Sequence, residues 1–324
     1  SGCALEIEDP EIDDRALEEN DVDVGSNAAA LRGGKVVTGY PGVVDFFNKL
    51  GATTAEATAN CTGSMIAPDV VLTAAHCFDG LGAKSLKTGS SLFTIRYYDP
   101  DRGIRIVYDG SATWSVFPTY GGSDPIGPDG SDRDIAVIQI PTTFSGTDHT
   151  DYLRVYSDYG SRLDESLQVY GAGRHTYSNA TDNKLRTNWF EVAGYSYDHI
   201  VVDNRDSVSI CVGDSGGPWV HSTVSGTSRI PTVAGVTSSG DVDRDSEGIV
   251  CTNNDPPYDD SYGCRTNWVH MSWVEDVTGI RCDLHTESEE DYRRCFELPF
   301  IEKVPYEGTY STELASALVV AAAL

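Results

Sequence analysis

Residues 210–219 read ICVGDSGGPW and set one serine, Ser215, among three glycines. Glycine loses more backbone freedom on folding than any other residue, so a cluster of glycines indicates a backbone held in an unusual path. A serine hydroxyl is a weak nucleophile until a neighbouring base takes its proton. The stretch by itself fits a tight structural turn, and it fits a reactive site only if the chain also supplies a base and a group that orients this base.

Composition indicates a strand-rich globular protein from an oxidising compartment. The 324 residues are enough for one large or two modest domains, and 40% of them are hydrophobic. The formal net charge of −27 argues against a nucleic-acid partner, because phosphate binding needs clustered Lys and Arg. Eight cysteines without paired C-x-x-C spacing indicate disulfides, and therefore a secreted or extracytoplasmic protein. No apolar run reaches the roughly 20 residues that a membrane helix needs.

Three segments are expected along the chain. Residues 1–30 hold ten acidic residues, one Arg15 and no aromatic residue, so they are predicted to form a propeptide or mobile tail. Residues 31–281 are expected to form the main domain. Residues 282–324 form an extension without a predicted role, whose apolar end is expected to pack as a helix or to fray.

Short apolar runs separated by Gly, Pro, Asn and Asp are typical of strands joined by turns. Such runs occupy residues 70–74, 92–98, 104–108, 135–140, 167–170 and 232–237. Helical spacing is found late in the chain, at 268–277, where Trp268, Met271 and Val274 would share a face. Strands at short intervals predict a sandwich or barrel architecture, and the length suits two antiparallel barrels.

A candidate base lies far upstream of Ser215. Residues 70–77, VVLTAAHC, run from an apolar strand through two alanines, which allow a close turn, to His76 and Cys77. A candidate orienting group lies in residues 132–140, DRDIAVIQI, where Asp134 precedes a strongly apolar strand. A carboxylate buried at that point needs a partner, and an imidazole is a natural one.

These motifs resemble those of the chymotrypsin/trypsin family of serine peptidases over roughly residues 31–279. The matching stretches are 61–65 (CTGSM), 71–77 (VLTAAHC), 134–137 (DIAV) and 211–218 (CVGDSGGP). They follow the family's order, His then Asp then Ser, at spacings of 58 and 81 residues. The resemblance implies an all-β fold of two antiparallel six-stranded Greek-key barrels with a C-terminal helix. It also implies a monomeric serine endopeptidase that acts on proteins or peptides without a cofactor.

The resemblance implies catalytic roles for His76, Asp134 and Ser215. Ser215 would attack the scissile carbonyl, His76 would take the serine proton, and Asp134 would hold the imidazole. Backbone N–H groups of Gly213 and Ser215 would form the oxyanion hole. Two alternatives remain open, an inactive homologue that acts as a binding protein and an enzyme of the same fold that acts on esters.

The resemblance also locates substrate-binding residues. The base of the primary specificity pocket falls on Ser209, an open wall falls on Gly240, and Ser238 lies on the substrate side of the triad. An uncharged pocket base offers no ion pair to a basic P1 residue, so a large apolar or aromatic P1 residue is expected. The remaining wall falls near Tyr262 or Gly263, and an inward-pointing tyrosine would instead favour small P1 residues.

Activation by cleavage is a further implication of the resemblance. Asp214 would pair with an α-amino group freed from a precursor. Residues 31–34, LRGG, align with the family's mature start, which puts the cut after Ala30 and makes Leu31 the new amino terminus. Arg32 departs from the pattern, because an apolar residue is expected there, and a cut after it would leave a Gly-Gly start. Cleavage at another site, or no activation by cleavage, also remains open.

The cysteines are expected to form several disulfides. Cys61–Cys77 comes first, because it would close the loop that carries His76. Cys211 is expected to pair with Cys251, or alternatively with Cys264, and Cys282 is close enough in sequence to pair with Cys295. The first three residues, Ser-Gly-Cys, also resemble the end of a bacterial lipobox, so Cys3 is either a lipid anchor or a structural cysteine.

One acidic loop has the oxygen ligands of a calcium site at alternate positions, on Asp241, Asp243 and Asp245. It lacks the glycine and the terminal bidentate ligand of an EF-hand, so a solvated acidic loop fits the pattern better.

Overall fold

A computed structural model describes the chain from Leu31 to Phe296 with gaps. The described residues are 31, 34–37, 42–48, 61–99, 103–121, 133–147, 152–156, 166–173, 184–196, 199–203, 210–225, 228–240, 242–244, 250–252, 260–285 and 292–296. The expected acidic tail (1–30) and the apolar end of the chain lie outside the described residues.

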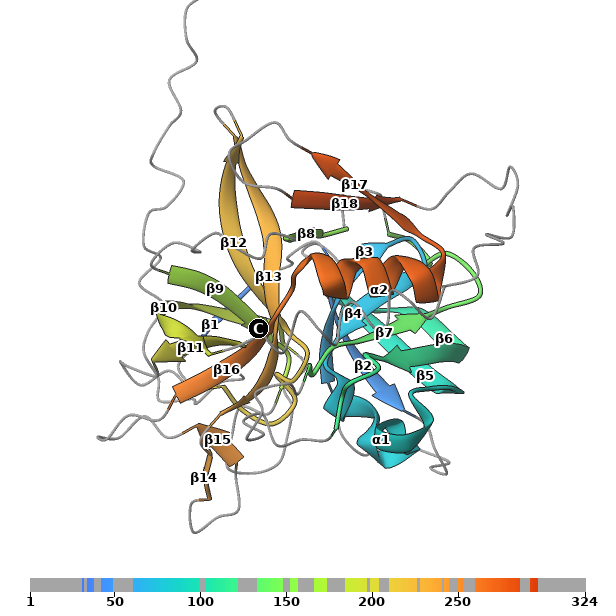
Figure 1. Cartoon of the computed structure of the whole chain (residues 1–324), viewed down its shortest axis with the longest axis horizontal. Coiled ribbons are helices and arrows are strands. Elements are labelled where there is room, and N and C mark those ends of the chain that lie inside the picture. The colour runs from blue at the N-terminus through green and yellow to red at the C-terminus, as the bar shows by residue number, and fades with distance from the viewer. Residues whose placement is uncertain are drawn as a thin grey trace, which may run out of the picture.

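The first barrel is a closed antiparallel sheet of six strands from the N-terminal half of the chain (Figure 1). Its strands are β2 (Val43–Asn48), β3 (Cys61–Ala67), β4 (Val70–Thr73), β5 (Thr88–Asp99), β6 (Gly103–Val116) and β7 (Ala136–Gln139). They lie in the order β2-β3-β4-β7-β6-β5, and pairing of β2 with β5 closes the barrel. Four rings with centroids 5.5 to 6.1 Å apart pack together in its core, those of Phe46, Phe78, Phe93 and Trp114.

The second barrel repeats this topology with strands from the C-terminal half. Its strands are β9 (Ser166–Gly171), β10 (Arg186–Ser196), β11 (His199–Asp203), β12 (Pro218–Ser225), β13 (Ser228–Gly240) and β16 (Asp260–Arg265). Pairing of β12 with both β9 and β13 closes the ring. If the strands of each barrel are numbered along the chain, both barrels have the order 1-2-3-6-5-4, which is a Greek-key arrangement.

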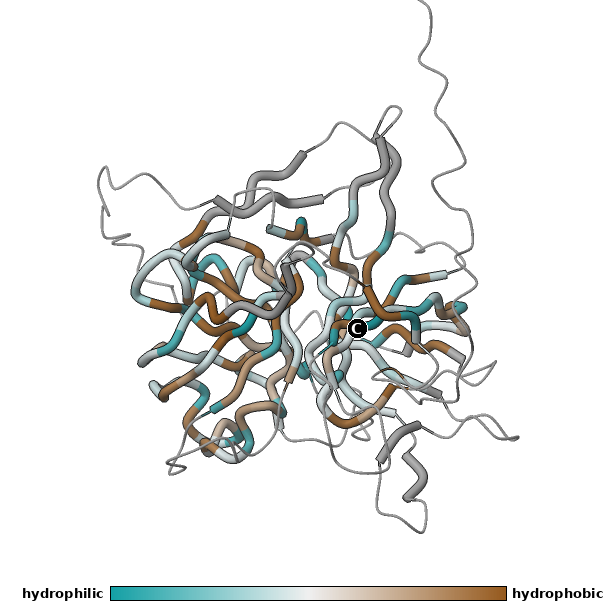
Figure 2. The backbone as a smooth tube through the Cα atoms, turned by 180° about the vertical axis from the view of Figure 1, so that it is seen from behind, coloured by the Kyte–Doolittle hydropathy of each residue, from teal (hydrophilic) through white to brown (hydrophobic). Residues whose placement is uncertain are grey.

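Hydrophobic segments follow the strands of both barrels, as the brown stretches of Figure 2 show. The second barrel buries a cluster that includes Leu167, Val169, Ile200 and Trp219. Gly263 of β16 lies against the indole of Trp219 so closely that a Cβ at this position would fall 2.7 Å from the ring. A glycine is therefore required there by packing rather than by backbone conformation.

Helix α2 (Trp268–Thr278) packs on a third hydrophobic cluster, to which both barrels contribute. Its first turn is capped by the side chain of Asn267, which accepts from the N–H groups of Val269 and His270, and Gly279 ends it in the left-handed region at φ 72°. The side-chain amide of Gln139 in the first barrel donates to the carbonyl of Thr278 at 2.7 Å. The late helix expected from the sequence is thus present and joins the barrels.

Part of the C-terminal extension belongs to the sheet of the second barrel. Strands β17 (Arg281–His285) and β18 (Tyr292–Phe296) form a hairpin that pairs with β8 (Arg154–Tyr156), and β8 in turn runs parallel to β13. The register of this hairpin sets Cys282 opposite Cys295. No strand was expected in this extension. The hairpin pairs with β8, which lies far away in the sequence, and the local pattern of the extension does not indicate this partner.

Three short strands complete the description. Strand β1 (Lys35–Val36) pairs with β10, and β14 (Val242–Arg244) pairs with β15 (Val250–Thr252).

Within the described residues, no helix has the length and the apolar character to cross a membrane. The expected all-β fold of two antiparallel six-stranded barrels with a C-terminal helix is confirmed.

Replacing Phe78 by alanine tests the aromatic packing in the first barrel. Phe78 is fully buried against three other rings, so Phe78→Ala is expected to lower the free energy of unfolding by about 3–5 kcal/mol. Leu86→Ala is the control, because Leu86 is 61% exposed and its loss is expected to change stability by about 0.5 kcal/mol or less. Chemical denaturation measures both, and equal effects of the two changes would contradict this account of the core.

Candidate active site

Strand pairing in the first barrel brings His76 and Asp134 together. Strands β4 and β7 are antiparallel with Thr73 opposite Ala136, so the end of β4 lies beside the start of β7. His76 follows Thr73 by three residues in the 3-10 helix η2 (Ala75–Leu81), and Asp134 precedes Ala136 by two. The two side chains therefore meet at one end of the barrel, although 58 residues separate them.

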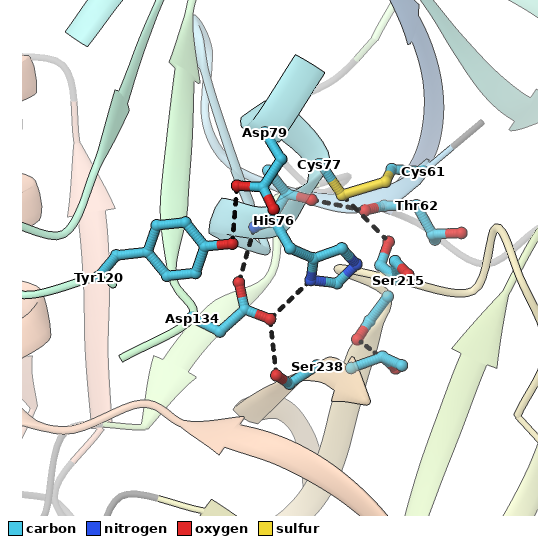
Figure 3. A network of polar contacts seen from close by, with 12 residues as sticks. Cys61, Thr62, His76, Cys77, Asp79, Tyr120, Asp134, Ser215 and Ser238 are labelled. Atoms are coloured by element: carbon cyan, nitrogen blue, oxygen red, sulfur yellow. Dashed lines mark hydrogen bonds and ion pairs between the residues drawn. A yellow bond between two sulfur atoms is a disulfide. The ribbon is translucent and has the colours of Figure 1, made fainter. Parts of the chain in front are cut away.

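Asp134 holds His76 at two points. The carboxylate Oδ2 lies 2.6 Å from His76 Nδ1, and Oδ1 accepts the backbone N–H of His76 at 2.8 Å. The hydroxyl of Ser238, on β13 of the second barrel, donates to Oδ2 at 2.6 Å (Figure 3). A carboxylate at Nδ1 selects the imidazole tautomer that carries its proton there, which leaves Nε2 as the proton acceptor.

The electrostatics of the pair follow from burial and mutual attraction. Burial alone would lower the pKa of His76, but the charge of Asp134 and the hydrogen bond to it, with a smaller effect of Asp79, raise that pKa above its ordinary 6.5. Burial alone would raise the pKa of Asp134, but His76 and the Ser238 hydroxyl hold it below its ordinary 3.8.

These shifts determine the pH range in which the pair stabilises the fold. The contribution of His76 is fully present below pH 6.5 and is lost as the pH rises through its raised pKa. The contribution of Asp134 is present above pH 3.8 and is lost as the pH falls through its lowered pKa.

Tyr120 and Asp79 support the helix that carries His76. The Tyr120 hydroxyl donates to Asp79 Oδ1 at 2.9 Å (Figure 3). The backbone carbonyl of Tyr120 accepts from the Lys87 ammonium. Asp79 also pairs with Lys84 at 3.5 Å. The sequence showed no sign of this network, because its members come from two separate segments, residues 79–87 and the loop after β6.

The loop that carries Ser215 belongs to the second barrel but packs on the first. The backbone N–H of Thr62 donates to the carbonyl of Ser215 at 2.8 Å, and the Thr62 hydroxyl donates to the carbonyl of Gly213 at 2.8 Å. Gly216, at φ 78°, lies so close to Thr73 and Thr62 that an added Cβ would overlap their oxygen atoms. Thr62 was not singled out from the sequence as a site residue, although it lies in the stretch CTGSM.

Ser215 is drawn in Figure 3 on the side of the His76 ring that faces away from Asp134. Within the part of the chain that the structure describes, no hydrogen bond joins the His76 ring to the Ser215 hydroxyl. Such bonds are often long in an enzyme without substrate and tighten when substrate binds.

The backbone around Ser215 presents two N–H groups. Gly213 has a φ of 100°, a conformation that favours glycine, and its carbonyl and that of Ser215 are both bonded to Thr62. Among the described residues, the N–H groups of Gly213 and Ser215 have no acceptor, whereas the N–H groups of Asp214 and Gly216 bond to backbone carbonyls. The arrangement therefore leaves two donors for an oxygen atom of a bound molecule.

A disulfide joins Cys61 of β3 to Cys77, with a Cα–Cα distance of 6.4 Å. It links the first barrel to η2 beside His76, and Cys77 Sγ lies 4.0 Å from the carbonyl of Ser215. Ligand atoms of Cys61, His76 and Cys77 lie within 4.8 Å of one another. They do not form a metal site, because the two sulfur atoms are already bonded to each other.

Asp214 lies at the centre of a second buried site. Its Oδ2 accepts the backbone N–H of Leu31 at 3.2 Å and that of Cys211 at 2.8 Å, and its Oδ1 accepts the N–H of Gly173 at 3.0 Å. Burial raises the pKa of Asp214 to about 6, and the three N–H groups and the charge of Arg186 limit this rise. Leu31 itself is fully buried and has a φ of 44°, in the left-handed region.

The remaining predicted site residues fall in different places. Ser209 lies outside the described residues, and Gly240 is half-buried at the end of β13, opposite Ser261. Tyr262 lies on the face of β16 opposite to that of Gly263, since successive residues of a strand alternate.

Cys211 is in a disulfide, and Cys264 is a buried thiol, so Cys264 is not its partner. Cys3 and the side chains of Cys251, Cys282 and Cys295 lie outside the described parts of the structure. The same holds for the side chains of the proposed calcium ligands Asp241, Asp243 and Asp245, so that site stays a prediction.

Comparisons with known proteins bear on the fold and the family. The family model described as Trypsin matches residues 39–255. Among solved structures, the chain is similar to one titled as HL collagenase, with 20% sequence identity and a TM-score of 0.49, over 79% of this chain and 99% of that chain. No curated protein matches the chain.

The titration of His76 tests the electrostatics of the pair. We expect the imidazole to titrate above pH 6.5 in the unaltered protein and below it in Asp134→Asn, because burial then acts without the opposing charge. Asp79→Asn should lower the pKa less, since its charge has the smaller effect. NMR of the histidine ring measures all three, and an unchanged pKa in Asp134→Asn would contradict the assignment.

Proposed function

The chain belongs to the trypsin family of serine peptidases, and we propose that it is an active serine endopeptidase in which Ser215 is the nucleophile. The observation that carries this proposal is the 2.6 Å contact between His76 Nδ1 and Asp134 Oδ2, which orients Nε2 as a base, together with the two backbone donors at Gly213 and Ser215.

The proposed reaction has two stages. In the first, the Ser215 oxygen bonds to the scissile carbonyl carbon while its proton moves to Nε2 of His76. The carbonyl oxygen becomes an oxyanion, which the N–H groups of Gly213 and Ser215 stabilise. The carbon–nitrogen bond then breaks, and the amine leaves with the proton from His76. In the second stage, water attacks the acyl carbon and gives a proton to His76, and the bond between this carbon and the Ser215 oxygen then breaks. The carboxylic acid product leaves, and Ser215 regains its proton from His76.

Asp134 acts through His76 in this scheme. Its two oxygen atoms hold the ring and the backbone of the same residue, so the imidazole cannot rotate freely. Its negative charge stabilises the imidazolium that forms when the serine proton is taken. Ser238 restrains Asp134 from the second barrel, so both barrels contribute to the position of the base.

For the substrate, we infer a preference for a large apolar or aromatic P1 residue. This rests on the resemblance that puts the uncharged Ser209 at the base of the pocket and Gly240 in its wall. Val212, directly before the oxyanion donor Gly213, is 37% exposed and adds apolar surface beside the site.

We also propose that cleavage after Ala30 increases the activity. The backbone nitrogen of Leu31 already lies 3.2 Å from Asp214 Oδ2, so a cut at this bond would turn an amide donor into an ammonium partner without moving it far. The cut would also relieve strain, because φ 44° is unfavourable for leucine and an amino-terminal residue has no preceding carbonyl to constrain it. The proposal thus links the buried Leu31 to the state of Asp214.

Removal of the Ser215 hydroxyl tests the central claim. Ser215→Ala is expected to abolish labelling by a fluorophosphonate probe and to reduce peptide hydrolysis to the roughly 10³–10⁴-fold residual rate over water that the rest of such a site provides. Ser115→Ala is the control, because this half-buried serine bonds to Thr88 of the first barrel and not to a residue of the triad, so the variant should retain labelling and turnover. If the unaltered protein takes up no probe, or Ser215→Ala turns over normally, the proposed function is wrong.

A library of peptides that differ only at P1 tests the pocket. We expect kcat/KM to be higher for Phe, Tyr or Leu than for Arg or Lys by about ten-fold or more, because burying a cation without a counter-charge is costly. A clear preference for Arg would show that Ser209 is not the base of the pocket, and a preference for Ala or Gly would support the narrower pocket with Tyr262 inside it.

A further inference from the structure

The buried carboxylate of Asp214 holds the loop of Ser215 in place. The backbone N–H of Asp214 donates to the carbonyl of Cys211, and its own carbonyl accepts from Gly217, so both ends of the loop are tied to this residue. The side chain is fully buried. A buried charge is costly unless it is paired, and backbone N–H groups supply partial charges only. The folded loop therefore needs a positive charge near Asp214 at pH values where this carboxylate is ionised.

The strand register sets Arg186 beside this carboxylate. Arg186, the first residue of β10, is the direct partner of Gly171 on β9. Gly171 faces Asp214, because a Cβ added to Gly171 would overlap Asp214 Oδ1. Directly opposite residues of an antiparallel pair project from the same face of the sheet. The side chain of Arg186 therefore extends over the face on which Asp214 lies, and Gly171 has no side chain to separate the two.

Three observations favour an electrostatic role for this arginine. Arg186 is only 5% exposed, and an arginine keeps its charge when it is buried. Its positive charge lowers the pKa of Asp214, against the effect of burial. Among the described residues it is the one whose charge acts on Asp214, since Leu31, Cys211 and Gly173 contribute backbone N–H groups only.

The segment that follows Leu31, residues 35–37, lies beside Arg186. Val36 of β1 pairs with Arg186, and the N–H of Val37 donates to the carbonyl of Leu185 at 2.9 Å. The strand that brings Leu31 to Asp214 is therefore hydrogen-bonded to the strand that carries Arg186.

We propose that Arg186 is the built-in counter-charge of Asp214, so that the Ser215 loop and its two backbone donors are formed in the uncleaved chain. Arg186 is a positioning residue, since it acts through Asp214 and touches no reacting atom. Cleavage after Ala30 then adds a second cation to a site that is already formed, and the uncleaved chain is an active peptidase. This inference rests on the proposed function for its activity readout.

The experiment compares uncleaved and cleaved protein in the full chain. Residues 26–30 are replaced by an enteropeptidase site, so that the folded chain can be cut directly before Leu31. Each form is measured with and without Arg186→Gln, Arg186→Lys and Lys35→Gln. Lys35 is the matched control, because it is an exposed cation on the strand that pairs with β10.

We expect kcat/KM to increase with the number of cations near Asp214. The uncleaved chain should be active, and cleavage should raise its kcat/KM only a few-fold. Arg186→Gln should reduce the activity of the uncleaved chain by about ten-fold or more, because removal of one partner leaves a buried charge uncompensated. Cleavage should restore most of that loss, since the Leu31 ammonium takes over, while Arg186→Lys and Lys35→Gln should stay near the unaltered protein. Restoration by cleavage also shows that the variant has folded.

Two outcomes would overturn the inference. One is an uncleaved Arg186→Gln chain that is as active as the uncleaved unaltered chain. The other is an uncleaved unaltered chain that is inactive until it is cut, which would mean that Arg186 cannot support the loop. A folded Arg186→Gln protein that stays impaired after cleavage would also count against it, because a purely structural role predicts this result.

A second measurement does not depend on catalysis. The pKa of Asp214 is raised to about 6, so its charge destabilises the fold increasingly as the pH rises from the ordinary 3.8 through that value. Arg186→Gln should therefore lower the melting temperature of the uncleaved chain more at pH 8 than at pH 5, and Asp214→Asn should remove this pH dependence. An equal loss at both pH values would contradict the inference. If Arg186→Gln has this pH-dependent effect in a protein that shows no hydrolysis, the proposed function is wrong, but the pairing of Arg186 with Asp214 is supported.

Discussion

The site depends on one contact between the two barrels, the packing of the Ser215 loop against Thr62 and Thr73. Thr62 bonds to the carbonyls of Ser215 and Gly213, and Gly216 approaches both threonines more closely than any side chain would permit. The first barrel contributes the proposed base, His76, and its carboxylate partner, and the second contributes the proposed nucleophile, Ser215. Their relative position is therefore set by backbone hydrogen bonds and by the lack of a Cβ. This explains why glycine, in spite of its entropic penalty, is retained beside the serine.

Two buried aspartates serve this arrangement, and their surroundings shift their pKa values in opposite directions. Asp134 faces a group that can become cationic and a hydroxyl that donates to it, so attraction outweighs burial and the pKa falls. Asp214 faces backbone N–H groups and a more distant guanidinium, so burial prevails and the pKa rises to about 6. The first carboxylate is therefore stable as an anion and suits a role beside the imidazole. The second is sensitive to any cation that is added or removed nearby, which makes it a point at which the loop of Ser215 can be controlled.

The periphery of the molecule supports the same site from a distance. Helix α2 packs on a cluster shared by both barrels, and the hairpin of β17 and β18 continues the sheet of the second barrel through β8. Tyr120 ties the loop after β6 to Asp79, on the helix that carries His76. Helix α2, the hairpin and Tyr120 therefore restrain the barrels and the helix that carries His76. None of them belongs to the proposed triad.

Local patterns predicted the strands, the late helix and a barrel or sandwich architecture, and the resemblance carried by four short motifs implied the Greek-key barrels and the roles of the site residues. The short apolar runs, the helical spacing at 268–277 and the motifs around His76, Asp134 and Ser215 depend on residues close together in the chain, and so does the Cys61–Cys77 pairing beside them. The contacts that only the tertiary structure decided join segments that lie far apart in the chain. The opposition of Gly171 and Arg186, the approach of Thr62 to the Ser215 loop and the addition of β18 to β8 are of this kind. A shift of one residue in the pairing of β9 with β10 or of β18 with β8 would turn the side chains to the other face of the sheet, and the pattern within one strand does not identify the distant strand with which it pairs.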